Sequence, residues 1–93
     1  MYSREYTIMT KEKKLENYLE SKNRIYDNDS ILYQGIRNTK MLDGTYKKLH
    51  LVNFTVSISN QQFDSNIGYF ATFDINTEEL FEIIGPQSYE KIG

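Results

Sequence analysis

The sequence contains no cysteine among its 93 residues, so it can form neither a disulfide framework nor a thiolate metal site. A cysteine nucleophile is excluded for the same reason. The chain also contains no apolar run as long as a membrane span, and its first ten residues lack the apolar core of a signal peptide. We therefore expect a cytoplasmic protein that is stabilised by side-chain packing alone and has no membrane partner.

Proline and glycine are scarce, with one proline and five glycines. The single proline, Pro86, lies near the end of the chain, and no Pro/Gly-rich linker, repeat or low-complexity tract interrupts it. The glycines are scattered and match neither a phosphate-binding loop nor a dinucleotide-binding fingerprint. These features predict a single domain over residues 1–93 and no nucleotide cofactor.

Aromatic residues are abundant, with 8 Tyr and 5 Phe, and they supply large faces for a core or an interface. Charged residues make up 26% of the chain and the net charge is only -2, which is far from the pattern of a disordered protein. Ile, Asn, Lys, Tyr and Phe are frequent and have codons rich in A and T. This composition indicates an AT-rich genome, such as that of a low-GC bacterium or its phages.

The spacing of apolar residues predicts one helix followed by strands. Between Thr10 and Lys22, the residues Leu15, Tyr18 and Leu19 recur on one helical face, and Thr10 can cap the helix. Strands are expected over 31–38, 46–59, 67–73 and 80–84, with a loop over 60–66. Within the second strand, four apolar residues alternate with polar ones, which is the period of a sheet with one buried face. These four are Val52, Phe54, Val56 and Ile58.

Two turns connect the expected strands. Asp43-Gly44 is a strong hairpin signal because glycine readily adopts the left-handed conformation. The segment 74–78 resembles a second hairpin connection. Gly35 and Gly68 lie inside strands, where we expect β-bulges or a close approach of the helix. Together these elements predict an α+β fold, with the N-terminal helix packed on a four-stranded antiparallel meander as a two-layer sandwich, or on five strands if residues 89–92 pair at the edge.

Candidate catalytic and metal-ligating residues are few. His50 is the only histidine, and no nucleophile elbow or activated serine accompanies it, so we assign it no catalytic role. Residues 74–78 alternate like the first ligands of a calcium loop, but the positions that require glycine and a bidentate acid hold Glu79 and Gly85. We therefore predict that the protein is not an enzyme and has no metal site and no cofactor.

Charge is divided unevenly along the chain. Residues 1–48 contain ten Lys or Arg and seven Asp or Glu, a net charge of +3, whereas residues 49–93 contain one and six, a net charge of -5. An acidic surface formed by the second half would be suited to a basic protein partner. The predicted partner-binding residues are Asp74, Glu78, Glu79, Glu82 and Glu90.

These observations favour a small non-enzymatic protein-binding module. The specific hypothesis is an inhibitor or immunity protein of a bacterial mobile element or phage, which occupies a basic surface of a partner such as a host defence nuclease. One alternative is a homo-oligomeric structural domain, such as a homodimer, or a small-ligand-binding domain. The third is a nucleic-acid-binding protein that uses its basic first half, although interspersed acids and a sequence pI near 5.3 argue against nucleic acid as a partner.

Overall fold

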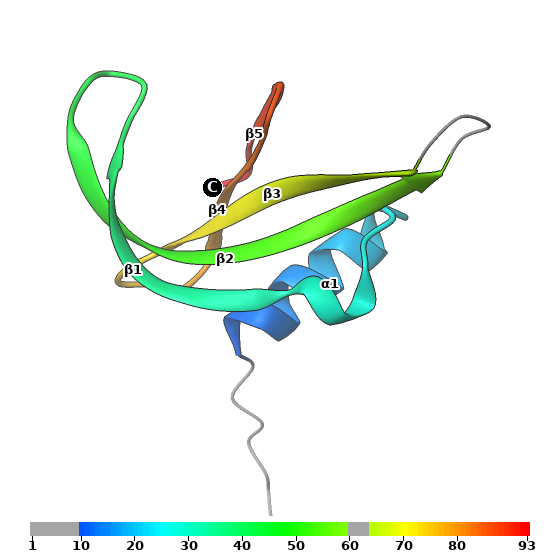
Figure 1. Ribbon diagram of the computed structural model, residues 1–93. Coiled ribbons are helices and arrows are strands. Elements are labelled where there is room, and N and C mark those ends of the chain that lie inside the picture. Colours follow the sequence, from blue (N-terminus) through cyan, green and yellow to red (C-terminus); the bar gives the residue numbers. More distant parts are fainter. Residues whose placement is uncertain (1–9, 60–63) are drawn as a thin grey trace, which may run out of the picture.

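The computed structural model describes residues 10–59 and 64–93 of the protein (Figure 1). These residues form one helix, one short 3-10 turn and five strands. The strands form a single antiparallel sheet in the order β1-β2-β3-β4-β5, which is a meander. The predicted α+β fold is therefore confirmed, with the fifth strand present. The elements are α1 (Lys11–Ser21), η1 (Asn28–Ser30), β1 (Leu32–Lys40), β2 (Tyr46–Ser59), β3 (Asp64–Asp74), β4 (Leu80–Gly85) and β5 (Ser88–Lys91).

Helix α1 begins and packs as its sequence predicts. The side chain of Thr10 accepts a hydrogen bond from the backbone N–H of Lys13 at 3.1 Å, which satisfies one of the free donors of the first turn. Leu15 and Leu19 are fully buried on the face toward the sheet. The helix lies along one face of the sheet, and no helix of the described residues lies on the opposite face, which we call the open face (Figure 1).

The core lies between α1 and the three central strands. Successive side chains of a strand point to opposite faces, so alternate residues of β2 and β3 point toward the helix. Directly opposite residues of an antiparallel pair share a face, so the inward residues of the two strands meet in pairs. Val52 pairs with Ala71 and Phe54 pairs with Tyr69, whose ring stacks on that of Phe54 with centroids 5.2 Å apart. The buried core residues are Leu15, Leu19, Val52, Phe54, Ala71, Phe73 and Ile83.

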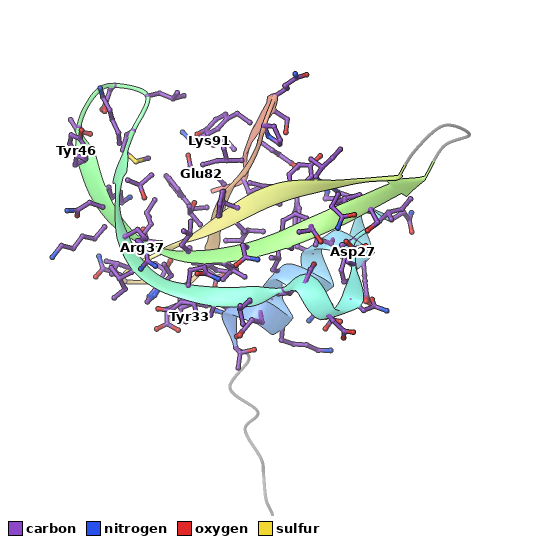
Figure 2. All side chains as sticks on the ribbon, viewed as in Figure 1. Asp27, Tyr33, Arg37, Tyr46, Glu82 and Lys91 are labelled. Atoms are coloured by element: carbon purple, nitrogen blue, oxygen red, sulfur yellow. The ribbon has the colours of Figure 1, made fainter. Side chains whose placement is uncertain are left out.

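The loop between α1 and β1 is fastened to the sheet by one carboxylate. Asp27 accepts hydrogen bonds from the hydroxyls of Thr55 and Ser57 on β2, and these bonds lower its pKa, with that of Thr55 as the largest cause. The backbone N–H of Asp27 also donates to the carbonyl of Thr55 at 2.9 Å. The start of β1 is thereby held beside β2, with which it pairs, and Figure 2 labels Asp27 at this end of the sheet.

Two expectations from the sequence are wrong. The loop predicted over 60–66 is a strand from Asp64 onward, because Asp64 pairs with Ser59 and Asn66 with Ser57, so polar residues extend the ladder; residues 60–63 lie outside the described part. Gly68 marks neither a bulge nor a close approach, since its register with Thr55 is continuous and a β-carbon added at Gly68 would meet no atom within 4 Å. Gly35 does mark a bulge, with a φ of 96° and a register shift between Tyr33 and Gly35.

The sheet is strongly curved, and the β1–β2 hairpin bends away from the helix (Figure 1). We call its free part, residues 37–48, the hairpin arm. Its turn is the predicted one: Gly44 has a φ of 90°, and the Asp43 carboxylate accepts hydrogen bonds from the backbone N–H and the hydroxyl of Thr45. The arm therefore extends as a two-stranded ribbon beyond the part of the sheet that α1 covers.

Candidate functional site

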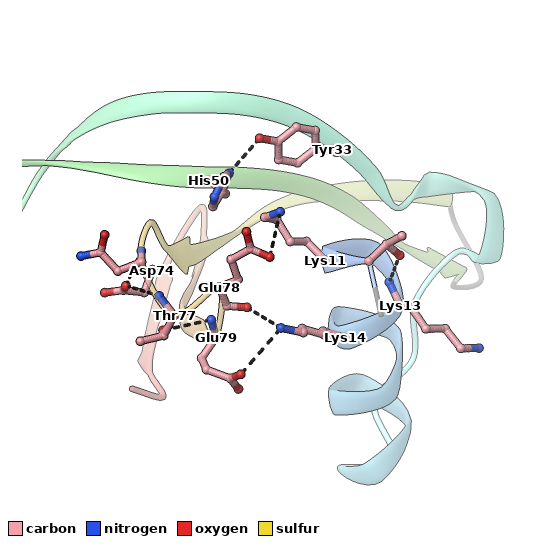
Figure 3. A network of polar contacts seen from close by, with 11 residues as sticks. Lys11, Lys13, Lys14, Tyr33, His50, Asp74, Thr77, Glu78 and Glu79 are labelled. Atoms are coloured by element: carbon pink, nitrogen blue, oxygen red, sulfur yellow. Dashed lines mark hydrogen bonds and ion pairs between the residues drawn. The ribbon is translucent and has the colours of Figure 1, made fainter. Parts of the chain in front are cut away.

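Two of the predicted partner-binding residues face the protein's own helix. The carboxylate of Glu78 lies 3.6 Å from the ammonium of Lys11, and that of Glu79 lies 3.6 Å from the ammonium of Lys14. Lys14 also donates to the backbone carbonyl of Glu78 at 2.8 Å (Figure 3). The side chains of Glu78 and Glu79 remain substantially exposed, so the pairs themselves add little stability.

Glu82 is placed differently, because only 3% of the residue is exposed. It lies on the open face of the sheet, where its carboxylate accepts hydrogen bonds from the hydroxyls of Thr72 at 3.1 Å and Tyr89 at 2.6 Å. Within residues 10–59 and 64–93, no cation forms an ion pair with it. Glu82 is thus a buried carboxylate held by neutral donors, and it is not available to a partner's surface.

Asp74 and Glu90 are also engaged within the chain. Asp74 accepts backbone N–H bonds from the turn that follows it, which lower its pKa, and it lies 3.6 Å from the ammonium of Lys47. Glu90 lies on the helix side of the sheet, where it accepts hydrogen bonds from the Tyr18 hydroxyl at 2.6 Å and the Arg24 guanidinium at 2.5 Å. The bond from Tyr18 is the main cause of the lowered pKa of Glu90.

The five acids therefore do not form one surface. Four of them pair with cations of the basic first half, from Lys11 to Lys47, and the fifth is buried. Much of the charge division seen in the sequence is thus used inside the fold. Partner binding by these acids stays a prediction; the side chains of Glu78, Glu79 and Glu90 are 50%, 75% and 41% exposed, whereas Glu82 is buried.

His50 belongs to a small polar cluster at the start of α1. Its Nδ1 lies 2.8 Å from the Tyr33 hydroxyl, the Lys11 ammonium lies 5.4 Å from the centre of the Tyr33 ring, and Glu78 pairs with Lys11. Burial, and then the charge of Lys11, lower the pKa of His50 below its ordinary 6.5. The hydroxyl of Tyr33 is hydrogen-bonded to the His50 ring.

The lowered pKa of His50 predicts a loss of stability in mild acid. Below pH 6.5 the unfolded chain binds a proton at this residue before the folded chain does, so the free energy of unfolding falls as the pH falls through 6.5 toward the folded pKa. His50→Gln should flatten this dependence between pH 7 and about pH 5.5, above the range in which carboxylates titrate. Urea unfolding at several pH values measures it, and equal slopes in both proteins would contradict the assignment.

The described residues offer neither a metal site nor a helical membrane span. No group of three or more His, Asp or Glu side chains is arranged to hold a metal ion in the part of the chain that the structure describes. In the same part, no helix has both the length and the apolar character of a membrane span.

Several strongly exposed apolar side chains lie on the hairpin arm and next to it. Leu42 at the turn is 86% exposed, Tyr46 is 68% exposed and Ile36 is 50% exposed. Ile36 pairs with His50, Asn38 with Lys48 and Lys40 with Tyr46, so alternate residues of both strands share one face. We call this set the outer arm face; it consists of Ile36, Asn38, Lys40, Tyr46 and Lys48.

The outer arm face combines apolar groups with free positive charge. Lys40 and Lys48 are exposed and form no ion pair with any described residue. Figure 2 shows Tyr46 on the outside of the bent hairpin, away from the body of the protein. An exposed aromatic ring between two unpaired ammonium groups is a surface suited to an acidic and partly apolar partner.

The inner face of the arm is tied to the body. The Lys47 ammonium lies 4.7 Å from the centre of the Phe81 ring on β4, in addition to its pairing with Asp74. A groove of about 360 Å³ separates Met41 and Leu42 of the arm from Phe81 and Tyr89 of the body. These contacts fix the direction in which the arm extends.

Sequence reasoning missed the outer arm face, although a signal for it was present. Lys40 and Tyr46 are separated by the five residues of the Asp43-Gly44 turn, and a hairpin places such positions opposite each other. The comparisons with known proteins add no constraint: no protein-family model matches the chain, and searches of the curated proteins and of the solved structures found no significant match.

Proposed function

We propose that this protein is a non-enzymatic protein-binding domain that engages its partner through the outer arm face. The observation that carries the proposal is the exposure of Ile36 and Tyr46 on one face with the unpaired Lys40 and Lys48. Tyrosine is among the residues that contribute most to binding energy at interfaces, because its ring is large and rigid and its hydroxyl can bond. The partner's surface is acidic around an apolar centre.

This proposal keeps the class of function expected from the sequence and changes the surface. The acids that suggested a basic partner are largely occupied by the chain's own cations, whereas the free cations of the arm require an acidic one. An inhibitor or immunity protein of a mobile element or phage is a narrower form of the proposal. It requires in addition that the captured partner lose its own activity.

Affinity capture from a lysate of the source cells tests the proposal. The double variant Ile36→Ser with Tyr46→Ser should lose at least about ten-fold of the captured partner, since it removes both apolar groups of the outer arm face. Ile25→Ser is the matched control, because Ile25 is 75% exposed but lies outside the arm. Nuclease treatment of the lysate separates a protein partner from one that is bridged by nucleic acid.

Two results would contradict the proposal. One is equal recovery of the same partner by the double variant and by the protein with native Ile36 and Tyr46. The other is a partner that disappears after nuclease treatment, which would favour nucleic acid as the ligand of Lys40 and Lys48. Circular dichroism of each variant checks that the fold is kept.

A further inference from the structure

Within residues 10–59 and 64–93, strand β1 pairs only with β2 and so forms one free edge of the sheet. A free edge presents unpaired backbone N–H and C=O groups and can accept a further strand. The bulge between Tyr33 and Gly35 interrupts the first part of this edge, whereas the register from Gly35 to Lys40 is continuous. The part of β1 that can pair regularly is therefore Ile36 to Lys40, next to the outer arm face.

The backbone direction at this edge follows from the turn. The N–H of Met41 donates to the carbonyl of Thr45 at 2.7 Å, so the backbone of Met41 is directed toward β2. Backbone groups of successive residues in an antiparallel strand alternate between the two sides. Ile36, Asn38 and Lys40 therefore direct both their N–H and C=O groups to the open edge. One bond agrees with this direction. The carbonyl of Ile36 accepts a hydrogen bond from the Arg37 guanidinium at 3.2 Å and not from the backbone of β2.

The charge of β1 distinguishes between occupants of this edge. Its sequence contains two cations, Arg37 and Lys40, and no acid. Neither cation forms an ion pair with a described residue. A second copy of β1 would bring four cations together, which disfavours self-pairing. A strand that carries acids would neutralise them and draw the Arg37 guanidinium away from the Ile36 carbonyl.

We propose that Ile36 to Lys40 of β1 accepts an extended acidic strand of the partner protein, which extends the sheet by a sixth strand. The inference rests on the proposed function and specifies how the partner binds. Backbone bonds to Ile36, Asn38 and Lys40 provide the pairing, and carboxylates of the added strand on the face of Arg37 provide the selectivity. The apolar side chains of the added strand then lie against Ile36.

Peptide probes test this mode without the natural partner. The first probe is an acetylated and amidated peptide of about seven residues in which Glu and Val alternate, and the second has Lys in place of every Glu. Titration into the isotope-labelled protein, followed by amide hydrogen exchange, should protect the amides of Ile36, Asn38 and Lys40. The Glu peptide should bind at least about ten-fold more tightly than the Lys peptide, with weaker binding at raised salt.

A matched pair of variants isolates the backbone contribution. Asn38→Pro removes an N–H that points to the open edge, whereas Asn38→Ala removes the side chain and keeps that N–H. Proline is tolerated at such edge positions, so both variants should fold, and only Asn38→Pro should lose about ten-fold or more in affinity for the Glu peptide. A Glu peptide with N-methyl groups on alternate residues should show the same loss with the unaltered protein.

Several outcomes would overturn the inference. These are equal binding of the Lys peptide, protection of amides elsewhere in the sheet, and equal affinity of the two Asn38 variants. A protein that is dimeric alone, with the same three amides already protected, would identify a second copy as the occupant. Tighter binding of an oligothymidylate at the same amides would identify nucleic acid. If the Glu peptide binds at Ile36 to Lys40 but the capture experiment fails, the proposed function is rejected and strand addition at this edge is kept. Failure of the proposed function can thus be told apart from failure of this inference.

Discussion

Glu82→Lys is expected to lower the free energy of unfolding by about 3–5 kcal/mol, which is much of the stability of a small domain. The residue is 3% exposed, and its carboxylate is held by the hydroxyls of Thr72 and Tyr89. A lysine at this position would bury an ammonium group without an acidic partner beside it. The cross-strand neighbour of Glu82 is Lys91, so the substitution would also place two cations opposite each other.

Glu82→Gln is the control for this effect. A hydroxyl can both donate and accept, so Thr72 and Tyr89 can satisfy an amide as well as a carboxylate. The cost of this substitution should stay within about 1 kcal/mol. Urea unfolding of the three proteins at neutral pH measures both changes, and a small effect of Glu82→Lys would show that the position is more open than its burial indicates.

The same burial limits how the acidic surface predicted from the sequence can be examined. A charge reversal that includes Glu82 would unfold the protein and abolish any binding for that reason alone. Reversal of Glu78 and Glu79 avoids this confusion, because both side chains are exposed and their ion pairs with Lys11 and Lys14 contribute little stability.

Leu19→Ala is the second substitution with a large expected effect, at about 2–5 kcal/mol of lost unfolding free energy. Leu19 is fully buried between α1 and the sheet, so its truncation removes apolar contact and leaves a cavity. Leu42→Ala is a matched control, since it makes the same chemical change at a residue that is 86% exposed, and it should cost no more than about 0.5 kcal/mol.

Thermal and urea unfolding of the two leucine variants provide the comparison. A similar loss of stability in both would mean that α1 contributes little to the core. Loss of helical circular dichroism in Leu19→Ala with the sheet signal retained would show in addition that α1 can detach by itself.

The strands and turns could be predicted from the sequence because their signals are local. The alternation from Val52 to Val56 and the Asp43-Gly44 turn each depend on neighbouring residues, and both elements are where they were expected. The start of β3 at Asp64 was not predictable in this way. Its polar residues are strand because they pair with Ser57 and Ser59, and only the register determines that.

The surroundings of the charged residues could not be predicted for a related reason. Glu82 was predicted to belong to an acidic partner-binding surface, but the residue is buried, and the hydroxyls of Thr72 and Tyr89 donate to its carboxylate. Glu78 and Lys11 are separated by more than sixty residues in the sequence, so no local pattern reveals their pairing. Lys40, Tyr46 and Lys48 are an exception: the Asp43-Gly44 turn places them on one face, so this surface could have been predicted from the sequence although it was missed.

The contacts of α1 have a consequence for how the chain folds. Tyr18 bonds to Glu90 across 72 positions, Lys14 bonds to Glu78 across 64, and Leu19 packs in a core that includes Ile83. The helix is synthesised before these partners, which lie in the turn before β4 and in β4 and β5. An isolated helix of eleven residues is only marginally stable in water. Docking of α1 must therefore be a late step, and the ordering of long-range contacts, rather than helix formation, should limit the folding rate.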